Sequence, residues 1–143
     1  MVRVLIADDH AVVRAGLRQF LEEDPGIGEI GEASTGREVL EALRAGRWDL
    51  LILDINMPDR SGLDILSHIR AVGFATRVLV MSGLPERQYA LNVLRAGARG
   101  YLSKDGAPEE LLKAVRAILD GRRYVSAALA EMLVSELDQD VEK

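Results

Sequence analysis

Five polar residues end short apolar runs of the chain or directly follow them: Asp8, Asp9, Asp54, Ser82 and Lys104. Three carboxylates that meet at one edge of a sheet repel each other unless a cation lies among them, and Mg²⁺, a hard ion with oxygen ligands, suits such a set. A lysine there would neutralise surplus negative charge and contact a phosphoryl oxygen, and a serine hydroxyl would donate to the same group. The set therefore predicts a site for a phosphoryl group carried on a carboxylate, with Mg²⁺ bridging the two.

Taken one at a time, these residues also suit ordinary structural roles. Asp8 and Asp9 suit a helix cap, and Ser82 suits a turn. Lys104 suits a solvated surface position. An aspartate that ends the apolar run LLILD is costly to bury without a partner, so Asp54 is either a metal ligand or a nucleophile. The joint occurrence of these residues at four strand ends favours the functional interpretation.

The elements that must position these residues are visible as alternating patterns. Five apolar runs predict the strands of a buried parallel sheet: residues 2–7, 27–33, 50–53, 78–81 and 100–102. Apolar stripes of helical period separate them, at 12–21, 39–43, 63–69, 90–94 and 111–119. This alternation predicts an α/β protein with helices on both faces of the sheet. In such folds ligands bind beyond the carboxyl ends of the strands, where the polar residues stand.

Composition excludes several classes of protein. The 143 residues are 48% hydrophobic and 29% charged, which predicts one globular domain. The chain has no cysteine and only two histidines, so disulfides, thiolate chemistry and a histidine-rich metal centre are not expected. A net charge of −5 disfavours direct nucleic-acid binding by these residues. Without an apolar run of membrane-spanning length or a signal peptide, we expect a cytoplasmic protein with no membrane contact.

These motifs, in this order, resemble the receiver domain of two-component response regulators, over about residues 2–121, and we expect that domain to span residues 1–121. The matching residues are the acidic pair at 8–9, Asp54 with the nearby string MPDRSG, Ser82 and Lys104. The resemblance implies a flavodoxin-like (βα)5 fold with a doubly wound, parallel, five-stranded sheet in the order 2-1-3-4-5. It also implies a signalling phospho-acceptor that takes its phosphoryl group from a sensor histidine kinase. Such a domain is not an enzyme beyond self-catalysed phosphoryl transfer and autodephosphorylation.

The resemblance assigns the metal ligands residue by residue. Asp54 accepts the phosphoryl group and, with Asp9, binds Mg²⁺ directly. The backbone carbonyl of Asn56 joins them, and Asp8 acts mostly through water.

The resemblance also assigns a switch. Ser82 and Lys104 bind phosphoryl oxygens. Tyr101 is the aromatic switch residue, whose ring changes rotamer when Ser82 moves toward the phosphoryl group. The surface built by the fourth helix, the fifth strand and the fifth helix then shifts to control an effector.

Finer details resemble the NarL/FixJ (LuxR-type) subfamily, in which a helix-turn-helix domain follows a linker. The matching strings are DDH at 8–10, AGARGYLSK at 96–104 and YVS at 124–126. We expect residues 122–143 to form a linker helix, at 126–137, and an acidic tail. DNA binding and transcription regulation would then belong to a parent protein whose effector domain is absent here, and phosphorylation could drive homodimerisation. The chain would be either an excised receiver or a natural single-domain regulator.

The alternative is a phosphatase of the haloacid dehalogenase type, which also forms an aspartyl phosphate. Such enzymes place a second aspartate two residues after the nucleophile as a general acid and base. Here that position is Asn56, which cannot transfer a proton in that way. The receiver interpretation is therefore favoured.

Overall fold

The computed structural model of the chain describes residues 1–83, 87–104 and 108–141. Strands and helices alternate along the chain. The strands are β1 (Val2–Ala7), β2 (Ile27–Ala33), β3 (Leu50–Asp54), β4 (Arg77–Ser82), β5 (Gly100–Ser103) and β6 (Tyr124–Val125). The helices are α1 (Ala11–Glu22), α2 (Gly36–Ala45), α3 (Gly62–Val72), α4 (Arg87–Arg95), α5 (Pro108–Leu119) and α6 (Ala127–Val141).

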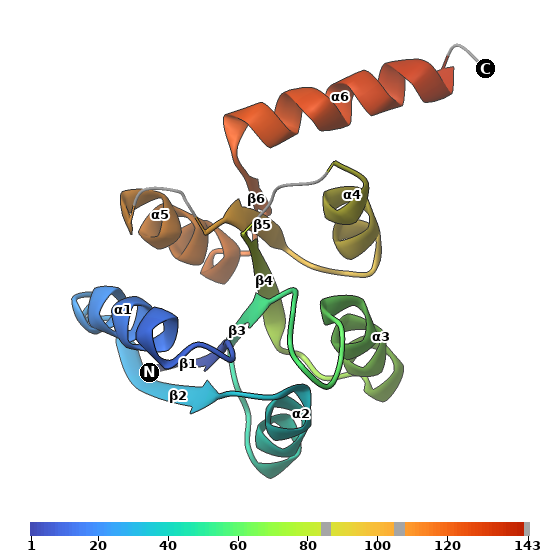
Figure 1. Cartoon of the computed structure of the whole chain (residues 1–143). Coiled ribbons are helices and arrows are strands. Elements are labelled where there is room, and N and C mark those ends of the chain that lie inside the picture. Colours follow the sequence, from blue (N-terminus) through green and yellow to red (C-terminus); the bar gives the residue numbers. More distant parts are fainter. Residues whose placement is uncertain (84–86, 105–107, 142–143) are drawn as a thin grey trace.

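The strands form one parallel sheet in the order β2-β1-β3-β4-β5-β6. Figure 1 shows α1 and α5 on one face of this sheet and α2, α3 and α4 on the other. Each face has its own apolar layer, because the central strands are buried on both sides and carry Val, Ile and Leu at almost every position. The predicted flavodoxin-like, doubly wound fold and the order 2-1-3-4-5 of the first five strands are confirmed.

The prediction of five strands is short by one, because the two residues of β6 extend the sheet beyond β5. Tyr124 donates its backbone N–H to the carbonyl of Arg99 at 3.0 Å, and it pairs with Gly100 in the ladder. A Cβ atom on Gly100 would lie 2.8 Å from the Tyr124 carbonyl oxygen, so the missing side chain lets the two backbones approach. A two-residue strand leaves too short a pattern to be found in sequence, whereas the exposed edge of β5 needs hydrogen-bond partners.

The loop after β3 is held in place by the start of α3. Ser61 caps α3 by accepting a hydrogen bond from the backbone N–H of Asp64 at 3.1 Å. Asn56 and Ser61 form an isolated bridge, and Gly62 donates its N–H to the carbonyl of Ile55 at 3.1 Å. These contacts fix the backbone that directly follows the last residue of β3.

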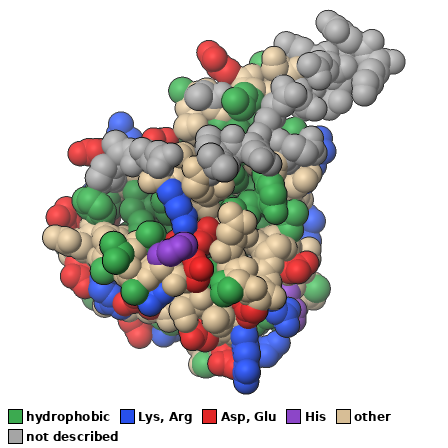
Figure 2. Space-filling model, in the orientation of Figure 1, with side chains coloured by type: hydrophobic (Ala, Val, Ile, Leu, Met, Phe, Trp, Pro, Cys, Tyr) green, Lys and Arg blue, Asp and Glu red, His purple; other side chains and the backbone are tan. Residues whose placement is uncertain are grey.

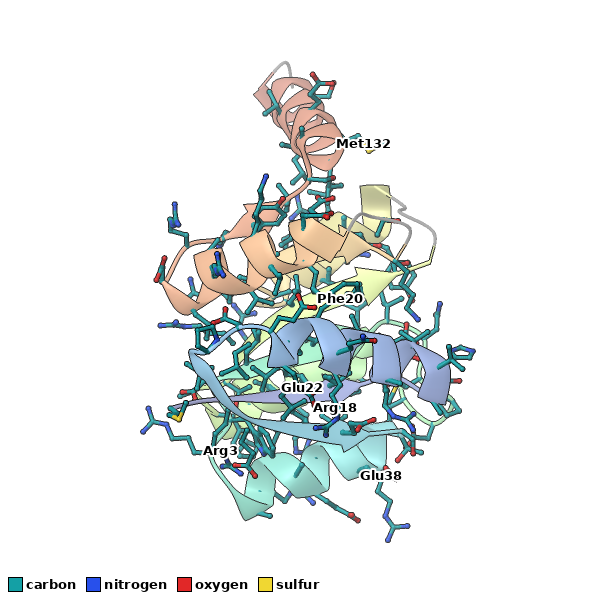
Figure 3. All side chains as sticks on the ribbon, turned by 90° about the vertical axis from the view of Figure 1, so that its left-hand side faces the viewer. Arg3, Arg18, Phe20, Glu22, Glu38 and Met132 are labelled. Atoms are coloured by element: carbon teal, nitrogen blue, oxygen red, sulfur yellow. The ribbon has the colours of Figure 1, made fainter. Side chains whose placement is uncertain are left out.

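Helix α6 lies against α4 and projects beyond the sheet (Figure 1). It is longer than the predicted helix at 126–137. Leu129 is 4% exposed and packs in the same apolar layer as α4, whereas Met132 is 41% exposed and projects from the side of α6 (Figure 3). Among the described residues, no helix has the length and apolar content that crossing a membrane requires.

Candidate functional site

Four strands bring their carboxyl ends to one edge of the sheet, and each presents a polar side chain there. Asp8 directly follows β1, Asp54 ends β3, Ser82 ends β4 and Lys104 directly follows β5. Backbone hydrogen bonds continue past the strand ends, for example from the N–H of Lys104 to the carbonyl of Ser82 at 2.7 Å. The parallel register therefore brings together residues that lie far apart in the sequence, as the strand-end pattern predicts.

Burial at this edge is unusual for charged groups. Asp8 is 2% exposed, Asp54 is 3% exposed and Ser82 is 5% exposed. Within the part of the chain that the structure describes, these three are the buried residues with charged or polar side chains, and the other buried side chains form the hydrophobic core. Carboxylates are rarely buried to this degree unless they are paired with a cation.

Lys104 is the cation that pairs with both buried carboxylates. Its Nζ lies 2.8 Å from Oδ2 of Asp8 and 3.1 Å from Oδ2 of Asp54. The lysine side chain is 20% exposed, so its charge is partly desolvated together with the carboxylates. One positive charge faces two negative charges, and the described site therefore has an excess of negative charge that suits a further cation.

The two aspartates differ in their pKa although both are buried. Burial opposes ionisation of Asp8, but hydrogen bonds from Lys104 and from the backbone N–H of His10 lower the pKa of Asp8 below its usual value. Burial raises the pKa of Asp54, and the nearby charge of Asp8 adds to the increase, although the Asn56 N–H and Lys104 oppose it. Burial opposes the charged form of Lys104, yet the two carboxylates raise its pKa overall.

Asp54 is also held by the loop that follows it. Its Oδ1 accepts a hydrogen bond from the backbone N–H of Asn56 at 3.2 Å, while its Oδ2 contacts Lys104. Asn56 itself is exposed, and its backbone also forms the bridge with Ser61. Both oxygens of Asp54 thus have defined partners, and the carboxylate is oriented toward the edge of the sheet.

Asp9 and His10 complete the described rim of the site on the side of α1. Asp9 is more open than Asp8, with 33% of its side chain exposed, and its Oδ1 lies 3.0 Å from Nδ1 of His10. The same ring nitrogen lies 3.1 Å from Oδ1 of Asp8. Figure 2 shows acidic, basic and histidine side chains side by side in the middle of this face.

One ligand atom from each of Asp8, Asp9, His10 and Asp54 lies within 4.8 Å of all the others. Carboxylate oxygens are the ligands that Mg²⁺ takes from proteins, and it needs only one or two of them beside water. The donor set therefore fits Mg²⁺. Sequence reasoning included the three aspartates in this set but missed His10, although its position directly after the acidic pair was the available signal.

Tyr101 lies deeper than the other candidate residues. It belongs to β5, is 1% exposed and packs in the apolar layer on the side of α4. Val93 of α4 and Leu129 of α6 belong to the same layer. The ring is therefore buried in the apolar layer to which α4 and α6 contribute, and a change of its rotamer would have to displace packing in that layer.

Comparison with known proteins agrees with this geometry. The family described as the response regulator receiver domain matches residues 4–116. The chain is 36% identical over 141 residues to the response regulator UvrY of Escherichia coli O6:H1, and the match covers 98% of this chain and 65% of UvrY. The chain thus spans less than two thirds of the length of this relative.

Two solved structures show the same fold at the level of the whole chain. A two-component response regulator of the LuxR family from Aurantimonas sp. SI85-9A1 is 34% identical, with a TM-score of 0.89, and the match covers 95% of this chain and 97% of that one. The response regulator RcsB, solved as two dimers bound to two parallel DNAs, is 27% identical with a TM-score of 0.85. That match covers 92% of this chain and 67% of RcsB.

Proposed function

The chain belongs to the response regulator receiver domain family, and from that premise we propose that Asp54 accepts a phosphoryl group with the help of a bound Mg²⁺ ion. The observation that carries this proposal is the buried Asp54 carboxylate at the end of β3, 3.1 Å from Lys104 and beside a second buried carboxylate. A nucleophile for phosphoryl transfer needs this combination of fixed position and nearby cations. The haloacid dehalogenase alternative has no comparable support.

Asp9, Asp54 and the backbone carbonyl of Asn56 would hold Mg²⁺ directly, with Asp8 acting mostly through water. When bound, Mg²⁺ neutralises charge on the carboxylates and on the transferring phosphoryl group. The 3.2 Å hydrogen bond from the Asn56 N–H orients the Asp54 carboxylate toward the opening of the site. The ionised form of Asp54 is the nucleophile, and burial raises the pKa of Asp54, which disfavours that form. The positive charge of Lys104 acts against this increase and so favours the reactive carboxylate.

In the transfer step, a carboxylate oxygen of Asp54 attacks phosphorus and forms a new P–O bond. The P–N bond to the donor, a phosphohistidine of a sensor kinase, breaks, and its electron pair stays on the imidazole nitrogen. That nitrogen takes up a proton from solvent, so the donor leaves as neutral histidine. Lys104 and Ser82 contact the equatorial phosphoryl oxygens and stabilise their charge. Later attack by water on phosphorus releases phosphate and restores the Asp54 carboxylate, which returns the signalling acceptor to its starting state.

The phosphoryl group would act on the rest of the molecule through Ser82 and Tyr101. When Ser82 moves toward the phosphoryl oxygens, space opens for the buried Tyr101 ring. A change of its rotamer shifts the equilibrium of the surface made by α4, β5 and α5. The described packing of Tyr101 against the α4 layer supports this route, because the ring cannot move without changing that surface.

The output would lie outside this chain. The chain spans 65% of the length of UvrY, and RcsB, a relative in fold and sequence, was solved as dimers on DNA. We propose a cytoplasmic parent protein in which residues 1–121 form the receiver and 122–143 a linker helix with an acidic tail. A helix-turn-helix domain beyond it would bind DNA and regulate transcription, with phosphorylation promoting a homodimer.

The proposal is tested by intact mass after incubation with acetyl phosphate and Mg²⁺. The parent chain should gain the mass of one phosphoryl group, and Asp54→Asn should gain none. Asp64→Asn is the matched control, because Asp64 is an exposed carboxylate of α3 with no ion pair in the described structure, and it should label like the parent. Labelling of Asp54→Asn, or absence of labelling in the parent, would contradict the proposal.

A further inference from the structure

His10 occupies a position where its ring has no structural task in the helix that it begins. It is the N-cap of α1, with extended backbone angles, yet its side chain makes no capping hydrogen bond. Serine, threonine, asparagine and aspartate are the residues that normally satisfy this position. The ring turns instead toward the acidic pair, where Nδ1 lies 3.0 Å from Asp9 Oδ1 and 3.1 Å from Asp8 Oδ1.

The position of the ring also leaves it accessible. The His10 side chain is 64% exposed, whereas the Asp8 side chain is 3% exposed. His10 is therefore open to solvent while its ring contacts the buried Asp8 carboxylate. The backbone N–H of His10 donates to Asp8 Oδ1 at 2.8 Å, which ties the ring's own residue to the site.

The distances fit a shared ion. Two neighbouring ligands of one octahedral ion, each at about 2.1 Å, lie about 3.0 Å apart. The Nδ1 atom of His10 has this separation from a carboxylate oxygen of Asp9 and nearly the same from one of Asp8. All four ligand atoms, including that of Asp54, lie within 4.8 Å of each other. Opposite ligands of such an ion would be about 4.2 Å apart. A small movement of the side chains would therefore bring all four ligand atoms within bonding distance of one ion.

We propose that His10 is a nitrogen ligand of the metal ion at this site, and that it makes the site favour Mn²⁺ and the later first-row ions over Mg²⁺. This inference rests on the proposed function, which places an ion among the same carboxylates. An imidazole nitrogen binds Ni²⁺ and Zn²⁺ more strongly than Mn²⁺. It binds all three more strongly than Mg²⁺, which prefers oxygen ligands. To bind the ion, Nδ1 must offer its lone pair, so the proton of the neutral ring lies on Nε2 in the metal-bound form.

The test uses the full chain without a histidine tag and compares it with His10→Asn. Asparagine is a good N-cap, so α1 is kept, but it offers an amide oxygen in place of the ring nitrogen. The matched control is His68→Asn, which removes the only other histidine, located on α3. Isothermal titration with Mg²⁺, Mn²⁺ and Ni²⁺ gives the affinities, and electron spin echo modulation of bound Mn²⁺ shows whether a ¹⁴N nucleus is coordinated.

We expect ¹⁴N modulation from an imidazole in the parent and in His68→Asn, and its loss in His10→Asn. Affinity for Ni²⁺ should fall at least on the order of 10-fold in His10→Asn, and affinity for Mg²⁺ should change by less than about 3-fold. Equal Ni²⁺ affinities, or no ¹⁴N modulation in the parent, would overturn the role of His10. If acetyl phosphate with Mg²⁺ still labels Asp54 in that case, the proposed function stands; if no ion binds any variant, both proposals fail.

Discussion

Replacing Lys104 with methionine should destabilise the protein and change how its stability depends on pH. Methionine keeps most of the side-chain volume and removes the charge. The variant is left with two carboxylates, 2% and 3% exposed, that have lost the cation 2.8 Å and 3.1 Å away. We expect a loss of free energy of unfolding of about 3 kcal/mol at pH 8.

The magnitude comes from opposing terms. Each ion pair at these distances contributes roughly 5 to 6 kcal/mol at an effective dielectric constant near 20, before the cost of desolvation is subtracted. Removing one partner of a buried pair typically costs about 3 to 5 kcal/mol, because the remaining charge is uncompensated. Lys104 is 20% exposed, and one carboxylate can relieve the repulsion by taking up a proton, so the lower end of this range applies.

The pH dependence follows from the directions of the pKa shifts. In the parent, the lowered pKa of Asp8 gives stability that is lost only as pH falls through that lowered value, whereas the raised pKa of Asp54 acts in the opposite sense. The raised pKa of Lys104 gives stability that is lost only as pH rises through a value above 10.5. Without Lys104, burial and mutual repulsion raise the pKa of the carboxyl pair, so protonation stabilises the variant as pH falls.

The deficit of Lys104→Met should therefore shrink from about 3 kcal/mol at pH 8 to about 1 to 2 kcal/mol at pH 5. Urea unfolding in EDTA measures it, with the fluorescence of Trp48, which is 8% exposed, as the probe. Lys113→Met is the control, because Lys113 is exposed on α5 and has no ion pair in the described structure, and its effect should stay within about 0.5 kcal/mol. A deficit that grows toward acid pH, or none at pH 8, would refute the electrostatic reasoning.

Four further substitutions, of which Met132→Ala is the control for Leu129→Ala, test the framework around the site by urea unfolding. Leu129→Ala should lower the free energy of unfolding by about 2 to 3 kcal/mol, because the Leu129 side chain is 4% exposed. Met132 is 41% exposed, so Met132→Ala should lower it by less than about 0.5 kcal/mol. Equal effects would show that α6 does not pack against the domain. Gly100→Ala should cost about 1 to 3 kcal/mol, since its Cβ would lie 2.8 Å from the Tyr124 carbonyl oxygen, and amide hydrogen exchange should show β6 released. Asp59→Ala should cost about 1 kcal/mol, because the Asp59 carboxylate accepts hydrogen bonds from the first two backbone N–H groups of α2. These bonds lower the pKa of Asp59, so the carboxylate is ionised at neutral pH. An unchanged stability of Asp59→Ala at neutral pH would contradict this capping role.

Local pattern was enough to predict most of the fold. Both ends of β1 and of β2 lie where the sequence predicts them, and the ends of β3, β4 and β5 lie within one residue of the prediction. The reason is that buried parallel strands appear in the sequence as continuous apolar runs bounded by polar residues. The helices followed from stripes of helical period. What this reasoning missed was β6, whose two residues are too few to show a period and whose place depends on the close approach permitted by Gly100.

The sequence by itself determined that Asp8, Asp54, Ser82 and Lys104 meet at one edge, because each ends or follows a strand and parallel strands end together. It did not determine how they differ. That Lys104 contacts two carboxylates, that burial moves the pKa of Asp54 up while hydrogen bonds move that of Asp8 down, and that His10 turns from its helix toward the acidic pair were decided only by the tertiary structure. The physical reason is that period and composition encode which positions are buried, whereas ion-pair geometry and desolvation depend on side chains brought together from distant parts of the chain.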